Sequence, residues 1–287
     1  MELFSAIYSR NTAQIARLLD AGADVNFVNP MVGLTVLNYY IRNGATAEQV
    51  QQFLDRGADP NKKNTHGGQT PLLTAIELKN LPIINVLLNG GANPNDNDAR
   101  GFSPLDKAVG NSNLEIVRRL LTAGAVVQPH TLANSLRFGT GDGLKIIKLL
   151  LNAGGNPNET IRMPNGEVHL ITHAVLTKKP KVVKALLDAG ADGNVVDTYR
   201  GQPIFPLLEA VQDENEEIVR ILADAGVYAE PHGFEGVLRA SVRYPEETAI
   251  MRILAEARRR HALAAFGRPA PTSRRQRRRR TRRTQRR

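Results

Sequence analysis

Apolar residues recur along the chain in a helical pattern, and each recurrence ends at a glycine. Four residues before the glycine stands a large apolar residue, and seven residues before it stands a β-branched residue, as with Leu87 and Ile84 before Gly91. Positions three and four apart lie on one face of a helix, so the pattern predicts amphipathic helices that end at a glycine with a left-handed backbone. The glycines that carry this pattern are Gly22, Gly57, Gly91, Gly124, Gly154, Gly190 and Gly226.

These glycines are 35, 34, 33, 30, 36 and 36 residues apart, which indicates one supersecondary unit repeated along the chain. A second helix is predicted earlier in each unit. Residues 69–75 (QTPLLTA) and 102–108 (FSPLDKA) place Thr or Ser at a helix cap and proline in the first helical turn. Each unit is therefore predicted to be a helix, a turn and a longer helix. A small residue that lets the two helices approach closely recurs at Ala6, Ala75, Ala108, Ala174 and Ala210.

Turn-forming residues follow most of the glycines, in sequences such as ADVN (residues 23–26) and ADPN (residues 58–61). Together, the TPL element, the apolar stripe before the glycine and this ending resemble the ankyrin repeat over residues 1–260. The resemblance implies about eight stacked helix pairs whose hairpin-like loops project at right angles. The expected fold is an all-α ankyrin-repeat solenoid of helix-turn-helix units with hairpin-like loops, followed by a disordered basic tail.

Some units depart from this pattern. The fifth unit, residues 128–154, is short and lacks the TPL element. The seventh unit has an insertion at residues 201–210, and Val36 replaces the proline in the second unit. In the last unit Arg258 stands at the glycine position, so the repeat pattern stops where a basic block begins.

The charge of the chain is unevenly distributed. The net charge is +10, yet residues 258–287 hold 14 arginines and no acidic residue, so residues 1–257 carry a net charge of −4. A block of like charge this dense cannot collapse on itself, and such blocks are typically disordered and used for contact with polyanions. We therefore predict a repeat domain at residues 1–261 and an arginine-rich, disordered tail at residues 262–287.

The tail has the chemistry of a polyanion-binding segment. Guanidinium groups stay charged and bind phosphates bidentately, so we expect low sequence specificity and an affinity that falls with salt. Three uses are consistent with this chemistry: import into the nucleus by a carrier, binding of RNA or DNA, and contact with an anionic membrane or an acidic protein. The residues predicted to bind nucleic acid or the import carrier, importin, are Arg274, Arg275, Arg277, Arg278, Arg279, Arg280, Arg282, Arg283, Arg286 and Arg287.

The composition argues against several classes of protein for this chain. The absence of cysteine excludes disulfides and thiolate metal sites, and the start MELF (residues 1–4) lacks the basic and long apolar regions of a secretory signal. No stretch reaches the roughly 18 consecutive apolar residues that a membrane-spanning helix needs, so membrane insertion is not predicted. We expect a monomer in the nucleus or cytoplasm of a cell, or of a host cell.

A catalytic or metal site is not predicted. His169 and His173 are four residues apart and on a helix could face one metal ion, but no glutamate follows His169 and no third ligand is evident. The two are expected to be solvent or groove histidines. No catalytic residue, cofactor or metal is therefore predicted, and an enzyme acting on the concave face is the least supported hypothesis.

The resemblance to ankyrin repeats implies a protein-binding groove. Members of this family usually grip partners with their loop tips and with the exposed side of the first helices. Apolar and aromatic tips such as Met31, Phe102 and Tyr199 suit the core of an interface, although they could instead pack on neighbouring loops. Transferred to this chain, the tips are Met31, Val32, Leu34, His66, Gln69, Arg100, Phe102, Tyr199, Arg200 and Gln202, and the first helices add Glu77, Leu78, Gln212 and Asp213.

The sequence thus favours a non-enzymatic adaptor that holds an unidentified protein in its groove while the tail provides nuclear targeting or nucleic-acid binding. The alternative is a structural component that packs nucleic acid inside a particle or ribonucleoprotein. In the turns, Asn26 and Asn61 resemble the site that an asparaginyl hydroxylase modifies in ankyrin proteins. A structural role, in which the side chain holds the loop by hydrogen bonds to the backbone, is the other interpretation.

Overall fold

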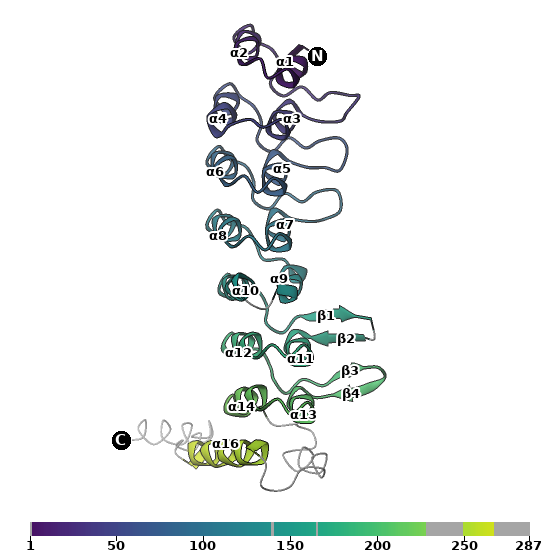
Figure 1. Cartoon of the computed structure of the whole chain (residues 1–287), viewed down its shortest axis with the longest axis vertical. Helices are drawn as coiled ribbons and strands as arrows, with labels where there is room; N and C mark the ends of the chain where they lie inside the picture. The colour runs from purple at the N-terminus through teal and green to yellow at the C-terminus, as the bar shows by residue number, and fades with distance from the viewer. Residues whose placement is uncertain (1, 139–140, 165, 228–248, 267–287) are drawn as a thin grey trace, which may run out of the picture.

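The apolar stripes of successive helix pairs pack on one another, so the chain builds an elongated stack (Figure 1). The computed structural model describes residues 2–138, 141–164, 166–227 and 249–266. Within these ranges, complete helix pairs form the first seven predicted units. The helix α16 (Ala249–Phe266) follows and packs on the second helix of the seventh unit.

The helices form two parallel rows, in which first helices stack on first helices and second helices on second helices (Figure 1). Most span only two or three turns, so they depend on this packing for their stability. The first helices are α1 (Glu2–Tyr8), α3 (Val36–Arg42), α5 (Pro71–Glu77), α7 (Pro104–Gly110), α9 (Pro129–Ser135), which continues into the 3₁₀ turn η1 (Leu136–Phe138), α11 (Leu170–Leu176) and α13 (Pro206–Gln212). The second helices are α2 (Thr12–Asp20), α4 (Ala47–Asp55), α6 (Leu81–Asn89), α8 (Leu114–Thr122), α10 (Asp142–Asn152), α12 (Pro180–Asp188) and α14 (Glu216–Asp224).

The ends of these helices follow from the residues that the sequence places there. The Thr70 and Ser103 side chains accept hydrogen bonds from backbone N–H groups in the first turns of α5 and α7. Thr35 caps α3 in the same way, so the loss of proline at Val36 leaves the cap intact. All seven predicted glycines follow a second helix with φ between +78° and +92°, which confirms the predicted left-handed ends.

The core runs without interruption along the stack. The stripe residues are fully buried, for example Ile84 and Leu87 in α6 and Leu120 in α8. Ala75 and Ala108 are also fully buried, as expected for small residues at points where helices meet.

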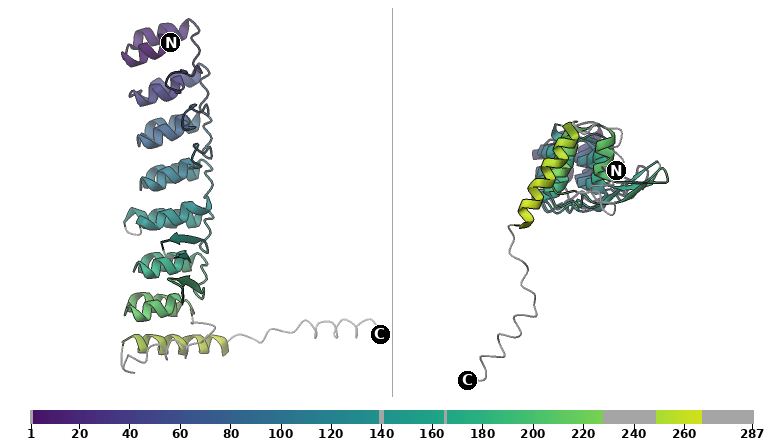
Figure 2. Two further views of the ribbon diagram at one scale, coloured as in Figure 1. Left: turned by 90° about the vertical axis from the view of Figure 1, so that its right-hand side faces the viewer. Right: turned by 90° about the horizontal axis from the view of Figure 1, so that it is seen from below.

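The loops before the first helices project to one side of the stack, and we call them fingers (Figures 1 and 2). Two of them are true β-hairpins: β1 (Thr160–Met163) pairs with β2 (Gly166–His169), and β3 (Asp197–Tyr199) pairs with β4 (Gln202–Ile204), both antiparallel. The all-α solenoid prediction is confirmed, with strands added in these two loops. The fingers, numbered by unit, are finger 2 (27–35), finger 3 (62–70), finger 4 (96–103), finger 6 (159–169) and finger 7 (197–205).

The fifth unit has no finger. Only residues 126–128 separate Ala125, at the end of the fourth unit, from α9, whereas residues 59–70 separate Ala58 from α5. The helices of the fifth unit nevertheless stay in the stack, because α9 packs on α7 and α10 packs between α8 and α12. The short fifth unit predicted from the sequence is therefore a complete helix pair without a projecting loop.

Asparagine side chains tie successive units together at the turns that follow the glycines. The Asn26 amide donates to the Gly57 carbonyl oxygen at 2.8 Å, and its oxygen accepts from the Asp59 N–H at 2.7 Å. The same pair of bonds recurs from Asn61, Asn95 and Asn158 to the following unit. These contacts favour the structural interpretation of the repeated asparagine, while its hydroxylation stays a prediction.

Candidate functional site

Fingers 2, 3 and 4 are held side by side by backbone hydrogen bonds. The Thr65 N–H donates to the Gly33 carbonyl at 2.9 Å, and the Ala99 N–H donates to the Gly67 carbonyl at 3.0 Å. Each finger therefore fixes the position of the next. Side chains at the tips are presented from a connected row rather than from independent loops.

Most of the predicted tip residues lie at the surface of this row. Met31 is 81% exposed, Val32 49% and Phe102 39%. His66, Arg100, Arg200 and Gln202 are exposed as well, whereas Leu34, Gln69 and Tyr199 are half-buried. The finger tips of the second and fourth units thus offer apolar side chains to a partner.

Two aromatic tips lie against cations of their own unit. The Lys107 ammonium lies 5.2 Å from the centre of the Phe102 ring, and the Arg200 guanidinium lies 5.4 Å from the centre of the Tyr199 ring. Such contacts favour one orientation of the ring. Phe102 and Tyr199 are therefore ordered by cation–π contacts that the sequence analysis did not predict.

A polar network crosses the first helices of units 2 to 4. The Gln69 amide donates to Glu77 Oε1 at 2.5 Å and accepts from Arg42 Nη2 at 2.6 Å, and Arg42 also approaches the Glu77 carboxylate at 3.5 Å. On the other side of Glu77, Lys107 Nζ lies at 3.9 Å. Gln69 and Glu77 were predicted to bind a partner, and the structure shows that they already bind each other.

The remaining predicted residues of the first helices lie at the ends of α5 and α13. Leu78 is 50% exposed, and Gln212 and Asp213 are also exposed. Asp213 forms an ion pair with Lys178 at 3.4 Å. These residues and the finger tips belong to different parts of the stack, so no single compact site joins all the predicted positions.

Asp98 anchors finger 4 from inside. Its side chain accepts hydrogen bonds from the backbone N–H groups of Arg100 and Phe102 at 2.9 and 3.0 Å, and Lys107 Nζ lies 3.0 Å away. Burial raises the pKa of Asp98, but the hydrogen bonds from Lys107 and from the two backbone N–H groups outweigh it and hold that pKa below its usual value. The ionised carboxylate therefore fixes the base of the finger that carries Phe102.

Two further buried carboxylates join neighbouring units. Asp106 in α7 lies 3.0 Å from His130 Nε2 and accepts from the Thr131 hydroxyl at 2.5 Å, both from α9. Asp197 of finger 7 lies 2.7 Å from His169 Nδ1 and accepts from the Thr172 hydroxyl. Buried charges of this kind must be paired or hydrogen-bonded, and here the histidine and threonine partners come from the adjacent unit.

His169 and His173, which were expected to be solvent or groove histidines, are both only partly exposed. His169 binds the buried Asp197, and His173 is half-buried with an Nδ1 atom that has no hydrogen-bond partner among the described residues. Burial, followed by the nearby Lys179 charge, lowers the pKa of His173. The sequence could not show this because Asp197 lies in the next unit, and its approach depends on how the units stack.

Glu159 is a half-buried carboxyl at the base of finger 6, and its Oε2 atom has no partner among the described residues. Burial raises the pKa of Glu159 to about 7, with a smaller opposing effect of His130. Because the folded state then binds this proton more tightly than the unfolded state, the Glu159 contribution to stability is lost as pH rises from about 4.5 to about 7.

Replacing Glu159 by glutamine removes the group that titrates in this window. Because solvent screens this partly exposed side chain, we expect the variant to gain only about 1 kcal/mol of stability relative to the original chain at pH 8, and little at pH 4. Urea unfolding followed by circular dichroism at both pH values measures the difference. Glu115→Gln, on the exposed face of α8, is the control and should show no such gain. An equal effect of Glu159→Gln at both pH values would contradict the assignment.

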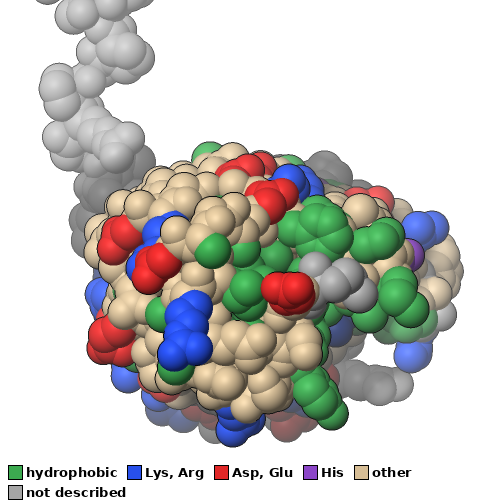
Figure 3. All heavy atoms as spheres, turned by 90° about the horizontal axis from the view of Figure 1, so that it is seen from above, with side chains coloured by type: hydrophobic (Ala, Val, Ile, Leu, Met, Phe, Trp, Pro, Cys, Tyr) green, Lys and Arg blue, Asp and Glu red, His purple; other side chains and the backbone are tan. Residues whose placement is uncertain are grey.

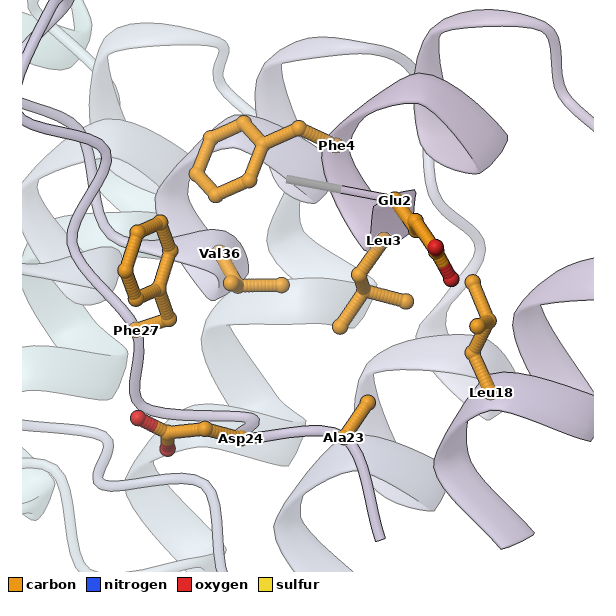
Figure 4. A pocket seen from close by; sticks show the side chains of 8 residues that line it. All are labelled: Glu2, Leu3, Phe4, Leu18, Ala23, Asp24, Phe27 and Val36. Carbon is orange, nitrogen blue, oxygen red and sulfur yellow. The ribbon is translucent and has the colours of Figure 1, made fainter. Parts of the chain in front are cut away.

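A pocket of about 410 Å³ opens at the N-terminal end of the stack (Figures 3 and 4). Its walls come from α1, α2, the turn after α2, finger 2 and the start of α3, and they are apolar except for the carboxylates of Glu2 and Asp24. The apolar lining consists of Leu3, Phe4, Leu18, Ala23, Phe27 and Val36. Figure 3 shows apolar side chains at this end of the molecule, where no described unit covers α1.

Within the described ranges, no helix is both long and apolar enough to cross a bilayer. The same residues contain no group of three or more His, Asp or Glu side chains that could hold a metal ion. The predicted polyanion-binding arginines from Arg274 to Arg287 lie outside the described residues. Their contacts stay a prediction.

Comparison with known sequences agrees with this architecture. The family described as ankyrin repeats, in three copies, matches residues 3–98 and again 37–130. A mouse homolog of B-cell lymphoma 3 protein is 38% identical over 93 residues, which cover 32% of this chain and 20% of the relative. An ankyrin repeat protein of fowlpox virus is 30% identical over 179 residues, which cover 61% of this chain and 40% of the relative. The chain thus spans at most two fifths of the length of these relatives.

Solved structures show the same fold. An ankyrin repeat domain from Acinetobacter baumannii superposes with a TM-score of 0.58 at 26% identity, covering 66% of this chain and 98% of that domain. The ankyrin repeat domain of Bcl-3 superposes with a TM-score of 0.61 at 22% identity, covering 77% of this chain and 97% of that domain. The chain is a helical repeat protein whose units each contact only their neighbours. It belongs to the ankyrin repeat family.

Proposed function

We propose that this chain is a non-enzymatic adaptor that holds a partner protein on its fingers and first helices, while its basic tail provides nuclear targeting or nucleic-acid binding. Ankyrin repeats form protein-interaction scaffolds, and the finger row supports that use here. The observation that carries the proposal is the exposure of Met31, Val32 and Phe102 on fingers joined by backbone hydrogen bonds. Preordered apolar tips reduce the entropy lost on binding, because few groups must be immobilised by the partner.

The polar network beneath the tips supports selectivity. Arg42, Glu77 and Lys107 lie between 23% and 40% exposed, so a partner that covers them must replace water by matching polar groups. Apolar contacts at the tips would then provide affinity, and the network would reject partners with the wrong charge. This arrangement is typical of an interface with an apolar centre and a polar rim.

Changing Met31 and Phe102 together tests the proposal. In a proximity-labelling comparison in cells, the Met31→Ser/Phe102→Ser chain should lose about tenfold in labelling of the partner that the original chain labels, because exposed apolar anchors dominate interface energies. Tyr8→Ser is the matched control, since Tyr8 is 76% exposed at the end of α1 away from the fingers. Equal loss in both variants, or in neither, would contradict a partner held by the finger row.

The alternative function is a structural component that packs nucleic acid inside a particle or ribonucleoprotein. It is favoured by the concentration of positive charge after residue 257, against a repeat domain of net charge −4. Co-purification with nucleic acid at a fixed ratio, unaffected by the finger variants, would favour this alternative over the adaptor.

A further inference from the structure

In finger 6, the outer edge of β1 presents backbone N–H and C=O groups that form no hydrogen bond with the described residues of the hairpin. In the antiparallel pair, Thr160 lies opposite His169 and Arg162 lies opposite Glu167. The Leu170 N–H donates to the Glu159 carbonyl at 2.9 Å, and bonded and non-bonded pairs alternate along an antiparallel ladder. The N–H and C=O groups of Thr160 and Arg162 therefore point away from β2.

The two edges of this hairpin have different neighbours. On the side of β2, the His169 N–H donates to Asp197 Oδ2 at 3.0 Å, so finger 7 occupies that edge. On the side of β1, no described residue forms a backbone hydrogen bond with the outward groups of Thr160 or Arg162. Figure 1 shows that this edge faces the level of α9, where no finger projects.

In the first half of the stack the corresponding edge is occupied. Finger 3 donates from Thr65 to Gly33 of finger 2, and finger 4 donates from Ala99 to Gly67 of finger 3. Finger 6 has no such neighbour, because residues 126–128 lead directly into α9. The open edge of β1 is thus a consequence of the short fifth unit. The position that a fifth finger would occupy lies next to this edge.

The side chains around the open edge include cations and one exposed carboxylate, that of Glu167 on β2, which lies opposite Arg162 and accepts a hydrogen bond from the Thr160 hydroxyl. Arg100 on finger 4 and Arg162 on β1 are both exposed, and His130 of α9 has a side chain that is 49% exposed. The nearby carboxylate of Asp106 is buried and hydrogen-bonded. On β1 the half-buried side chains of residues 161 and 163 alternate with the exposed ones of residues 160 and 162. A strand added here would meet apolar neighbours on one face, and on the other the Arg162 guanidinium, with Glu167 farther away on β2.

We propose that the edge of β1 binds an extended, acidic segment of a partner protein, which adds a third strand to finger 6 in the place of the absent fifth finger. The inference rests on the proposed scaffold function and names the form of the partner. Main-chain hydrogen bonds to Thr160 and Arg162 give affinity, with the added strand about 4.8 Å from β1. Alternating apolar and acidic side chains give specificity, the acidic ones lying beside Arg162.

The test uses a displayed library of random ten-residue peptides selected against the full chain. The enriched peptides should be acidic, and Arg162→Pro should weaken them about tenfold or more, since proline removes the outward N–H but no bond of the β1–β2 ladder. Arg162→Ala, which keeps the N–H, is the matched control and should weaken them by only about threefold through lost charge.

A second variant closes the edge without changing β1. Replacing Gln128 by the sequence of residues 95–103 restores a finger to the fifth unit, and it should abolish peptide binding. Hydrogen exchange should show the Thr160 and Arg162 amides exchanging fast in the original chain, and slowly in this variant or with peptide bound. The same measurement on Arg162→Pro checks that the Ile161 and Met163 amides stay protected, which shows that the hairpin remains folded.

Three results would overturn the proposal. One is the absence of any enriched peptide, and another is equal peptide binding by Arg162→Pro with its hairpin intact. The third is protection of Thr160 and Arg162 by self-association alone, which would identify a second copy of the chain as the occupant. If the proposal fails while the Met31 and Phe102 variant still loses its partner, the scaffold function stands without the β1 site.

Discussion

Ending the chain at Ala265 is expected to abolish its salt-dependent binding to nucleic acid. The removed residues include 11 arginines, so the formal net charge falls from +10 to −1. If six to ten phosphates are contacted, the affinity of the full chain should fall by about 10³ to 10⁵ between 50 and 200 mM salt. Fluorescence anisotropy with a random-sequence RNA or DNA oligonucleotide measures this dependence for both chains.

A full chain whose tail arginines are replaced by lysines keeps the charge and serves as the control. It should retain most of the salt dependence, because counterion release depends on the number of charges, although bidentate phosphate contacts are lost. Unchanged binding by the truncated chain would place the polyanion site in the repeats and refute the two-part organisation. Imaging the full and truncated chains in cells distinguishes nuclear targeting from nucleic-acid binding, since a targeting role predicts that the truncated chain changes its location.

Replacing Asp106 by alanine is expected to lower the free energy of unfolding by about 3 kcal/mol. The Asp106 side chain is 2% exposed and accepts hydrogen bonds from the Ser103 N–H, the Ser103 hydroxyl and the Thr131 hydroxyl, with His130 at 3.0 Å. Its loss removes half of the capping box of α7 and leaves the buried Thr131 hydroxyl without its acceptor. The units on both sides, the fourth and fifth, should loosen.

Urea unfolding gives the total effect, and hydrogen exchange gives its location. Asp188→Ala is the matched control, because that carboxylate is 62% exposed and forms only an i,i+4 pair with Lys184, so it should change stability by less than about 0.5 kcal/mol. A loss from Asp106→Ala no larger than that of the control would mean that the carboxylate does not join the two units.

The features that repeat in the sequence were predictable, because each depends on local chemistry. The glycine after each second helix adopts positive φ, and Thr70 and Ser103 cap the helices that begin with proline. The short fifth unit was also visible in the glycine spacing. Only the structure shows the consequence: the helical stack continues through the fifth unit, while the row of fingers is interrupted there.

Contacts between units could not be predicted, because they depend on how closely successive units stack. The network of Arg42, Glu77 and Lys107 joins three first helices, and the His169–Asp197 pair joins residues 28 positions apart. Neither follows from a helical or turn pattern. The exposure of the finger tips was easier to predict, since an apolar residue in a turn-rich segment has few neighbours to cover it, as at Met31.

The interrupted finger row also bears on avidity. Fingers 2 to 4 and fingers 6 to 7 form two groups on one continuous helical stack, so their separation is set by helix packing rather than by a linker. A partner with two recognition segments would bind the second group at a high effective concentration once the first is engaged, provided that its own spacer matches the separation. If the chain binds such a partner, the missing loop would let the stack discriminate between partners by the distance between their two binding segments.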